Sequence, residues 1–215
     1  MDTVLDAGGT VTDDWPVRSP PFDPSQAASV AGVVLAAGTS SRYGGANKLL
    51  ARLDGDPLVA RSVRAFLDAP VDPVVVVVGH ERERVRAALP DGVRTVHNPA
   101  YADGQSTSVR TGVDAIADDS DAVVVGLGDM PFVSAETVAT LERAFRAGVG
   151  DPLVAAVDGQ RGNPVCFGAQ WFDDLRSVGG DVGGRHLLRE ASTTALVETG
   201  DPGVRRDIDR PEDRP

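Results

Sequence analysis

The chain has 215 residues, a length that suits one α/β domain with an ample core. Its 21 basic and 32 acidic residues give a formal net charge of −11, which argues against nucleic acid and anionic membrane surfaces as partners. No apolar run approaches the roughly 18 residues of a transmembrane helix, and the N-terminus lacks the basic and apolar regions of a secretory signal.

Residues 1–29 are rich in proline and aspartate and show no sustained periodicity. We predict that they form a disordered extension, or that they follow a start codon placed too early. The folded part is expected to begin near Val30 and to form one domain over residues 30–215.

Strands and helices alternate from residue 30 to residue 150. Apolar runs that end at glycine or polar clusters indicate buried strands, and amphipathic spacing with capping residues indicates the helices between them. The predicted strands are Gly32–Ala37, Val74–Val78, Val93–Val96 and Ala122–Leu127, and the predicted helices are Leu49–Leu53 with Pro57–Leu67, Glu83–Leu89, Ser106 or Thr107 to Ala117, and Ser134 to about Arg146. This alternation predicts an α/β fold with a doubly wound, mostly parallel sheet in three layers.

The second half has shorter elements, with strands over 153–157, 163–167 and 195–199 and helices over 170–176 and 184–190. We expect residues 30–150 to bind a nucleotide and residues 151–215 to supply the pocket of a second substrate. Ligands of doubly wound sheets bind at the carboxyl ends of the strands. Polar residues that follow different strands can therefore share one cleft.

A glycine-rich loop follows the first predicted strand, with the sequence Leu35-Ala-Ala-Gly-Thr-Ser-Ser-Arg-Tyr-Gly-Gly-Ala-Asn-Lys48. Its glycines allow a ligand to approach backbone N–H groups, and Arg42 and Lys48 add positive charge. Lys48 is the only lysine in the chain, which indicates a specific need for a compact ammonium donor to phosphate. The loop matches neither the dinucleotide-binding fingerprint nor the Walker loop, and we interpret it as a cradle for a polyphosphate.

The pattern Leu-Ala-Ala-Gly-x-Ser-x-Arg-x-Gly-x-x-x-Lys resembles the signature of nucleotidyltransferases with a glycosyltransferase-A-like, Rossmann-like fold. It is particularly similar to the MobA-like molybdenum cofactor nucleotidyltransferases and, among them, to the cytidylyltransferase branch. The resemblance extends over residues 31–213 in five segments that keep their order. It implies catalytic roles for Arg42 and Lys48. The loop residues that it implies in nucleotide binding are Leu35, Ala36, Ala37, Gly38, Ser40, Ser41, Arg42 and Lys48.

Two acidic segments are candidates for a metal site. Asp129 follows the fourth predicted strand in Gly128-Asp-Met-Pro131 and resembles the family aspartate that holds the metal of the nucleotide phosphates. Asp207-Ile-Asp-Arg-Pro-Glu-Asp213 resembles the closing acidic segment of the family, and alternation puts Asp207 and Asp209 on one side of it. Because Mg²⁺ prefers carboxylate oxygens, we assign Asp129 and Asp209 as its ligands, Asp129 also as a catalytic residue, and prefer Asp209 to Asp207.

The segment Asn98–Ser108 resembles a family stretch that lines the nucleotide pocket, and free N–H groups at its helix start suit base or phosphate recognition. Ordinary capping of the helix by Ser106 is the alternative. His80, His97 and His186 show no metal-ligand spacing and are interpreted as structural or peripheral, although His80 is kept with the nucleotide-binding set. Besides the loop, this set comprises His80, Asn98, Gly104, Gln105, Ser106, Ser108 and Gly128.

Two further segments, Gly159–Pro164 and Gly180–Arg185, resemble loops that face the acceptor substrate in the same family. An arginine between glycines can bind an anionic phosphate with two hydrogen bonds. The acceptor-binding residues that the resemblance implies are Arg161, Gly162, Asn163, Pro164, Asp181, Gly183 and Arg185.

The single cysteine, Cys166, excludes an intrachain disulfide and fits a reducing cytosol, so we expect a cytoplasmic protein. Cys166 lies in the apolar run Pro164–Phe167. It is predicted to pack in the core rather than to act as a nucleophile.

The reaction implied by the resemblance is transfer of CMP from CTP to a molybdopterin-type acceptor, with Mg²⁺ as cofactor, pyrophosphate as product and a molybdoenzyme as recipient of the new cofactor. GMP transfer to the same pterin, and transfer to a sugar phosphate or another phosphorylated metabolite, remain open. A molybdopterin-binding chaperone without turnover is an alternative of another class. The missing fingerprint argues against a nicotinamide-dependent oxidoreductase.

The chain combines many aspartates with one lysine, a composition suited to high salt, and we infer a halophilic source. We therefore expect the folded state to be stable in molar salt and to be lost in dilute buffer, where acidic side chains repel one another without screening. Circular dichroism over a salt series measures this effect. A stable fold in dilute buffer would count against the inference.

Overall fold

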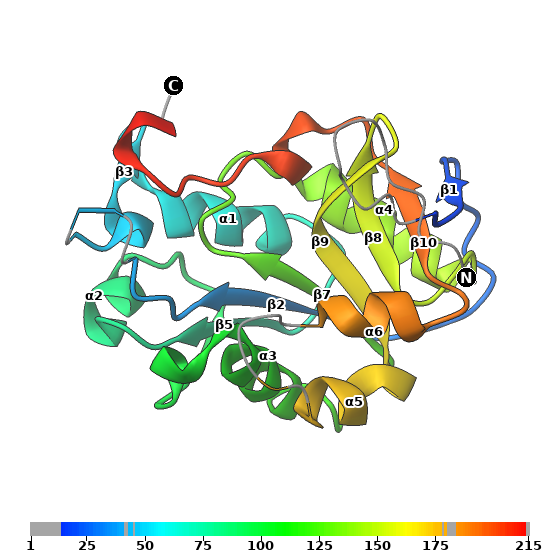
Figure 1. Ribbon diagram of the computed structural model, residues 1–215, viewed down its shortest axis with the longest axis horizontal. Coiled ribbons are helices and arrows are strands. Elements are labelled where there is room, and N and C mark those ends of the chain that lie inside the picture. The colour runs from blue at the N-terminus through cyan, green and yellow to red at the C-terminus, as the bar shows by residue number, and fades with distance from the viewer. Residues whose placement is uncertain (1–13, 41–42, 45, 178, 180–183, 214–215) are drawn as a thin grey trace.

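The computed structural model describes residues 14–40, 43–44, 46–177, 179 and 184–213. Its main sheet has the strand order β1-β10-β8-β9-β7-β2-β5-β6, and β9 is the strand that runs antiparallel to both of its neighbours (Figure 1). The strands are β1 (Val17–Arg18), β2 (Val30–Ala36), β5 (Val74–Val78), β6 (Arg94–His97), β7 (Ala122–Leu127), β8 (Leu153–Val157), β9 (Gln160–Gly168) and β10 (Ala195–Glu198). The prediction of an α/β fold with a mostly parallel sheet is confirmed.

Helices cover both faces of this sheet and give three layers (Figure 1). Val34 of β2 packs in a core with α1, α2 and α4, whereas its neighbour Val33 packs on the opposite face with α3, α5 and α6. The period of two along a buried strand explains this division. The helices are α1 (Leu58–Leu67), α2 (Arg82–Ala87), α3 (Gln105–Asp114), α4 (Ala135–Arg146), α5 (Phe172–Ser177) and α6 (Arg185–Glu190). No helix in the described ranges is long and apolar enough to cross a membrane.

Short elements connect the layers, and one of them differs from the prediction. They are η1 (Lys48–Leu50), η2 (Tyr101–Asp103), η3 (Ala169–Trp171), η4 (Pro202–Arg205), η5 (Pro211–Asp213) and the antiparallel pair β3 (Arg52–Leu53) and β4 (Asp56–Pro57). The segment Leu49–Leu53, expected to be helical, is divided between η1 and β3. Asp54 and Gly55, with φ values of 52° and 90°, form the tight turn of a hairpin, a conformation that Asp-Gly favours.

The N-terminal segment, residues 14–29, differs from the prediction of a disordered extension over residues 1–29. Residues 14–29 lie against the sheet, where β1 pairs in parallel with β10. Trp15 and Phe22 pack against the two opposite cores, and the Ser29 backbone N–H donates to the Asp121 carboxylate at 2.8 Å. Local composition gave no sign of these contacts because every partner is distant in the sequence. Residues 1–13 lie outside the described residues.

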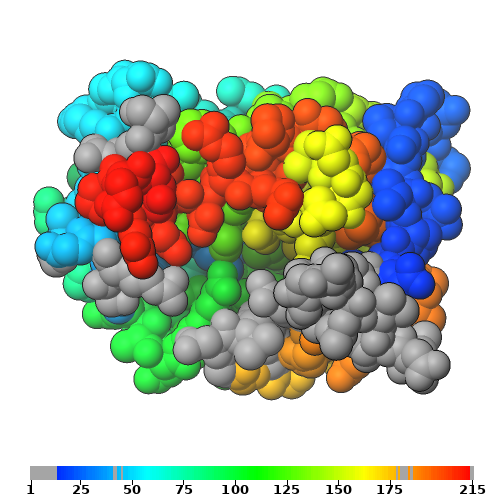
Figure 2. Space-filling view, turned by 45° about the horizontal axis from the view of Figure 1, so that its top comes forward, coloured from blue at the N-terminus to red at the C-terminus, as the bar shows by residue number. Residues whose placement is uncertain are grey.

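Asp201 links the C-terminal segment, residues 199–213, to the start of α4 through hydrogen bonds. One oxygen of this carboxylate accepts hydrogen bonds from the Ser134 backbone N–H at 2.9 Å and the Thr137 hydroxyl at 2.7 Å, and the other accepts from the Gly203 N–H at 2.8 Å. Burial raises the pKa of the Asp201 carboxyl, but these hydrogen bonds outweigh it and hold the pKa below its usual value. Figure 2 shows the segment, in red, crossing the surface from the β8–β9 turn (yellow) toward the light-blue and cyan segments that follow β2.

Replacing Asp201 with asparagine keeps the shape of the side chain but removes its charge. Because the folded-state pKa is lowered, the carboxylate stabilises the fold above its unfolded-state pKa of about 3.9, and this stability is lost as the pH falls through the folded-state value. We expect Asp201→Asn to lose about 1–3 kcal/mol of unfolding free energy at neutral pH, and the deficit to shrink in acid. Urea unfolding at several pH values measures the difference.

The matched control is Asp173→Asn, because the Asp173 side chain is 95% exposed and contacts only a surface arginine among its described ion pairs. It should change stability little at any pH. A deficit in Asp201→Asn that stays constant into acid would contradict the role of the charge.

Candidate functional site

Two adjoining cavities open at the carboxyl ends of β2 and β7, with volumes of about 420 Å³ and 240 Å³. They share a wall formed by Leu35, Gln105 and Leu127. The other residues that line the larger cavity are Ala36, Ala37, Gly38, Thr39, Ser40, Lys48, Leu49, Tyr101, Ala102, Gly104, Ser108, Asp129 and Asp209. The larger cavity therefore gathers the glycine loop, the start of α3 and both acidic segments singled out in the sequence.

The glycine loop folds back so that Lys48 returns to the end of β2. Ser40, whose φ is 54°, accepts a hydrogen bond on its hydroxyl oxygen from the Lys48 backbone N–H at 3.1 Å. The side-chain oxygen of Asn47 caps η1 by accepting from the Leu49 N–H at 3.1 Å. These bonds fix the point from which the lysine side chain enters the cavity. Ser41 and Arg42, which were predicted to bind the nucleotide, lie outside the described residues.

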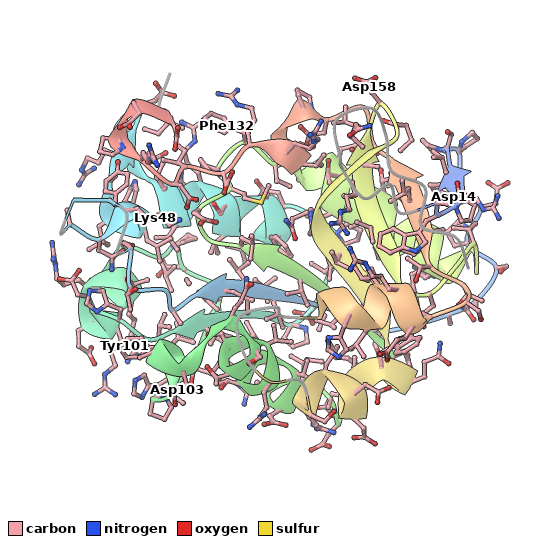
Figure 3. All side chains as sticks on the ribbon, in the orientation of Figure 1. Asp14, Lys48, Tyr101, Asp103, Phe132 and Asp158 are labelled. Atoms are coloured by element: carbon pink, nitrogen blue, oxygen red, sulfur yellow. The ribbon has the colours of Figure 1, made fainter. Side chains whose placement is uncertain are left out.

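The Lys48 ammonium lies between two carboxylates from distant parts of the chain. Figure 3 labels Lys48 beside the light-blue segment that follows β2. Nζ is 2.6 Å from Oδ2 of Asp129, which follows β7, and 2.5 Å from Oδ1 of Asp209 in the C-terminal segment. The side chains of Lys48 and Asp129 are 15% and 18% exposed, and that of Asp209 is 36% exposed. Burial lowers the pKa of Lys48, but the two carboxylates more than offset this and raise it above its usual value. The ammonium therefore stays charged and is shared by two negative groups.

The start of α3 reaches the larger cavity through some of its predicted residues. Gly104, with a φ of 117°, turns the chain into the helix, and Gln105 and Ser108 line the cavity. Asn98 is buried and supports this turn instead. Its Nδ2 donates to the hydroxyls of Thr107 at 2.8 Å and Ser108 at 3.0 Å, and its Oδ1 accepts from a backbone N–H.

Three further members of the predicted nucleotide-binding set do not line this cavity. Ser106 is buried behind the wall. The carbonyl of Gly128 accepts a hydrogen bond from the Ser62 hydroxyl at 3.0 Å. His80 lines a separate cavity with Tyr43, which matches its interpretation as peripheral rather than its place in the set.

Several residues that line the larger cavity lie outside the predicted nucleotide-binding set: Thr39, Leu49, Tyr101, Ala102 and Leu127. Tyr101 had a detectable signal, since it is the aromatic residue of the Asn98–Ser108 segment. Its ring packs so closely over Gly79 that a Cβ there would lie 2.6 Å from the Tyr101 Cβ. Gly79, which follows β5, therefore leaves room for the Tyr101 side chain that lines the cavity.

The smaller cavity combines polar groups with an apolar wall, and three predicted acceptor-binding residues, Arg161, Gly162 and Asn163, line it. Gly162 allows a close contact with the C-terminal segment, because a Cβ there would lie 2.1 Å from the carbonyl oxygen of Val204. The apolar wall residues are Val109, Val125, Val154, Val165, Phe167, Leu175 and Leu188. Pro164 does not line this cavity, Asp181 and Gly183 lie outside the described residues, and only the backbone of Arg185, at the start of α6, is described.

The family model of the MobA-like NTP transferase domain matches residues 32–195 of this chain. The chain belongs to this family. The matched region contains the glycine loop, Asp129 and the lining strands of both cavities. Asp209 and the N-terminal segment lie outside it.

Individual relatives of this MobA-like chain differ in length and in name. The chain is 31% identical to nicotine blue oxidoreductase of Paenarthrobacter nicotinovorans, over 85% of this chain and 93% of that protein. It is 36% identical to Bifunctional protein GlmU of Rubrobacter xylanophilus over 58% of this chain, but spans 27% of that protein's length. The crystal structure of Rv0371c from Mycobacterium tuberculosis H37Rv superposes with a TM-score of 0.75 at 25% identity, covering 87% of this chain and 96% of Rv0371c. A manganese complex of Rv0371c superposes with a TM-score of 0.72 at 24% identity.

The acidic residues of this MobA-like site fit a hard divalent cation. Oδ1 of Asp129 is buried and has no hydrogen-bond partner in the described part of the chain. Together with Asp209 it offers the carboxylate oxygens that Mg²⁺ prefers. The described residues contain no group of three acidic, histidine or cysteine side chains placed to hold a metal, so water or substrate phosphates would complete the coordination.

Replacing Lys48 with methionine would leave the carboxylates of Asp129 and Asp209 without their shared cation. We expect Lys48→Met to lose about 2 kcal/mol of unfolding free energy, because partly buried like charges are left unpaired. Millimolar Mg²⁺ should restore most of this loss in the variant and change the wild type little. Thermal unfolding with and without Mg²⁺ measures both effects.

The control is the double variant Lys48→Met with Asp129→Asn, which lacks one of the two carboxylates. It should gain little stability from Mg²⁺. The same Mg²⁺ response in all three proteins would show that the cation binds elsewhere.

Proposed function

We propose that this chain is a Mg²⁺-dependent nucleotidyltransferase that transfers CMP from CTP to a molybdopterin-type cofactor and releases pyrophosphate. The observation that carries the proposal is the Lys48 ammonium between Asp129 and Asp209, in a cavity lined by the glycine loop. A cation donor and paired carboxylates beside a glycine-rich loop are what a metal-bound triphosphate requires.

Nucleotidyl transfer depends on alignment and charge neutralisation, so the reaction needs no nucleophile from the protein. Mg²⁺ held by Asp129 and Asp209 would neutralise the phosphates of the nucleotide. Lys48 would then donate to phosphate oxygens instead of the carboxylates, and Arg42 is assigned the same task. Cys166 is buried in the core, where burial raises the pKa of its thiol well above the usual value, and it takes no part.

The two adjoining cavities suit two substrates. The larger would hold the triphosphate, with Gln105 and Ser108 at the nucleotide. The smaller would hold the acceptor, with the ring system on the apolar wall and an anionic group at Arg161. The two cavities adjoin at Leu35, Gln105 and Leu127. A phosphate of an acceptor in the smaller cavity could therefore reach the α-phosphorus of a triphosphate in the larger one.

A redox reaction is the second candidate, because the likeness to nicotine blue oxidoreductase spans nearly the full length of both chains. The glycine loop lacks the dinucleotide-binding fingerprint, which favours nucleotidyl transfer. Oxidation of NADH or NADPH by the protein, without pyrophosphate release from any triphosphate, would favour the redox candidate.

The proposal is tested by pyrophosphate release in molar salt with Mg²⁺, comparing CTP, GTP, ATP and UTP with and without molybdopterin. We expect release with CTP when the pterin is present. A preference for GTP would indicate guanylyl transfer. Release only with sugar phosphates or other phosphorylated metabolites would identify one of these compounds, instead of the pterin, as the acceptor. Binding of molybdopterin without release from any triphosphate would indicate a chaperone.

Two substitutions test the assigned roles in this reaction. We expect Lys48→Ala and Asp129→Ala each to lower turnover to background, because one removes the phosphate donor and the other a metal ligand, while circular dichroism shows a folded protein. Asp54→Asn, in the exposed β3–β4 turn at 81% side-chain exposure, is the control and should keep wild-type turnover. Near-normal turnover of either site variant would refute the assignment.

A further inference from the structure

The N-terminal segment brings a tryptophan against Arg161, a residue that lines the smaller cavity. Trp15 packs on the core that contains Phe167, Leu175 and Leu188, and these three residues also line the cavity. The segment lies before residues 32–195, the range matched by the family, so it adds to the common domain. It therefore brings a residue from outside the matched region into contact with a residue of the cavity.

The sheet fixes the position of this segment. Val17 and Arg18 pair with Leu196 and Val197 of β10, and the Leu196 N–H donates to the Pro16 carbonyl at 3.0 Å. Figure 1 shows β1 beside β10 at the edge of the sheet. Trp15 lies two residues before Val17, so main-chain hydrogen bonds of β1 and Pro16 fix the place from which its ring meets Arg161.

The Trp15 ring also contacts a polar residue of the cavity. The guanidinium carbon of Arg161 lies 5.8 Å from the centroid of the Trp15 ring, within the range of a cation–π contact. Arg161 lines the cavity near the start of β9. A long arginine side chain loses conformational entropy when it binds an anion. An aromatic ring at its face restricts the side chain before the anion binds, so less entropy is lost on binding.

We infer that Trp15 is a positioning residue for Arg161 in the acceptor site. The acceptor is then a compound with an anionic phosphate, which Arg161 binds, and a flat apolar body, which rests on the wall of valine, leucine and phenylalanine side chains. This inference rests on the proposed function, which assigns the smaller cavity to the acceptor. Its test uses binding alone, so a failure of nucleotidyl transfer would be seen separately.

Fluorescence tests the contact directly, because the chain has two tryptophans and Trp171→Phe leaves Trp15 as the sole emitter. Phenyl phosphate is the probe, since it joins a phosphate to a flat apolar ring. We expect a saturable change in Trp15 emission with phenyl phosphate, little change with phenol, and loss of the change in Trp171→Phe with Arg161→Ala. No saturable change, or the same change without Arg161, would overturn the inference.

Calorimetry of phenyl phosphate binding tests the positioning role without a fluorescent reporter. Trp15→Ala should weaken binding by about two- to fivefold, the size of an exposed cation–π contact. Trp15→Phe should restore most of the affinity because it keeps an aromatic face. Val17→Ala, in the same segment with a side chain 46% exposed, is the control and should bind like the wild type.

Equal loss in Trp15→Phe and Trp15→Ala would reduce Trp15 to a packing residue and overturn the positioning role. Weaker binding by Val17→Ala of the same size would point to a general effect of disturbing the segment, and would also overturn it. Retained affinity in Trp15→Ala has the same consequence.

Discussion

The ion pairs of Lys48 with Asp129 and Asp209 are the constraint on which the site depends. Three segments far apart in the sequence meet in them: the loop after β2, the turn after β7 and the C-terminal segment. Two largely buried carboxylates cannot lie so close without a cation between them. The chain supplies one in its single lysine, so Asp209 of the C-terminal segment can line the cavity beside Asp129 before any substrate is bound.

Apolar packing brings this polar cluster together. Ile208, between Asp207 and Asp209, is fully buried with Leu53 and Leu58, and its N–H donates to the Asp129 carbonyl at 3.0 Å. Burial raises the pKa of Asp207, and the charges of Asp209 and Asp129 add to the rise. The buried isoleucine therefore holds acidic residues where they repel one another, an arrangement that a cation relieves.

The sheet and the glycine loop could be predicted because their signals are local. The run Val74–Val78 and the apolar stretch before Gly38 indicate buried strands whatever surrounds them, and parallel topology then brings the residues after the strands to one edge. Contacts between distant segments could not be predicted in this way. Val17 and Arg18 pair with a strand near the far end of the chain, and the Ser29 N–H donates to Asp121.

Two residues from outside the family match, Asp209 and Trp15, contribute to the cavities from opposite ends of the chain. The family match begins at residue 32 and ends at residue 195. Asp209 lines the larger cavity from beyond one end, and Trp15 contacts Arg161 of the smaller cavity from beyond the other. The common domain supplies the glycine loop, Asp129 and the wall between the cavities. Relatives with names as different as GlmU and nicotine blue oxidoreductase share parts of that domain. The terminal segments can change without disturbing the strand ends that hold the loop, so we propose that they adjust the two cavities while the matched region, with Arg161, keeps the lining that the cavities share.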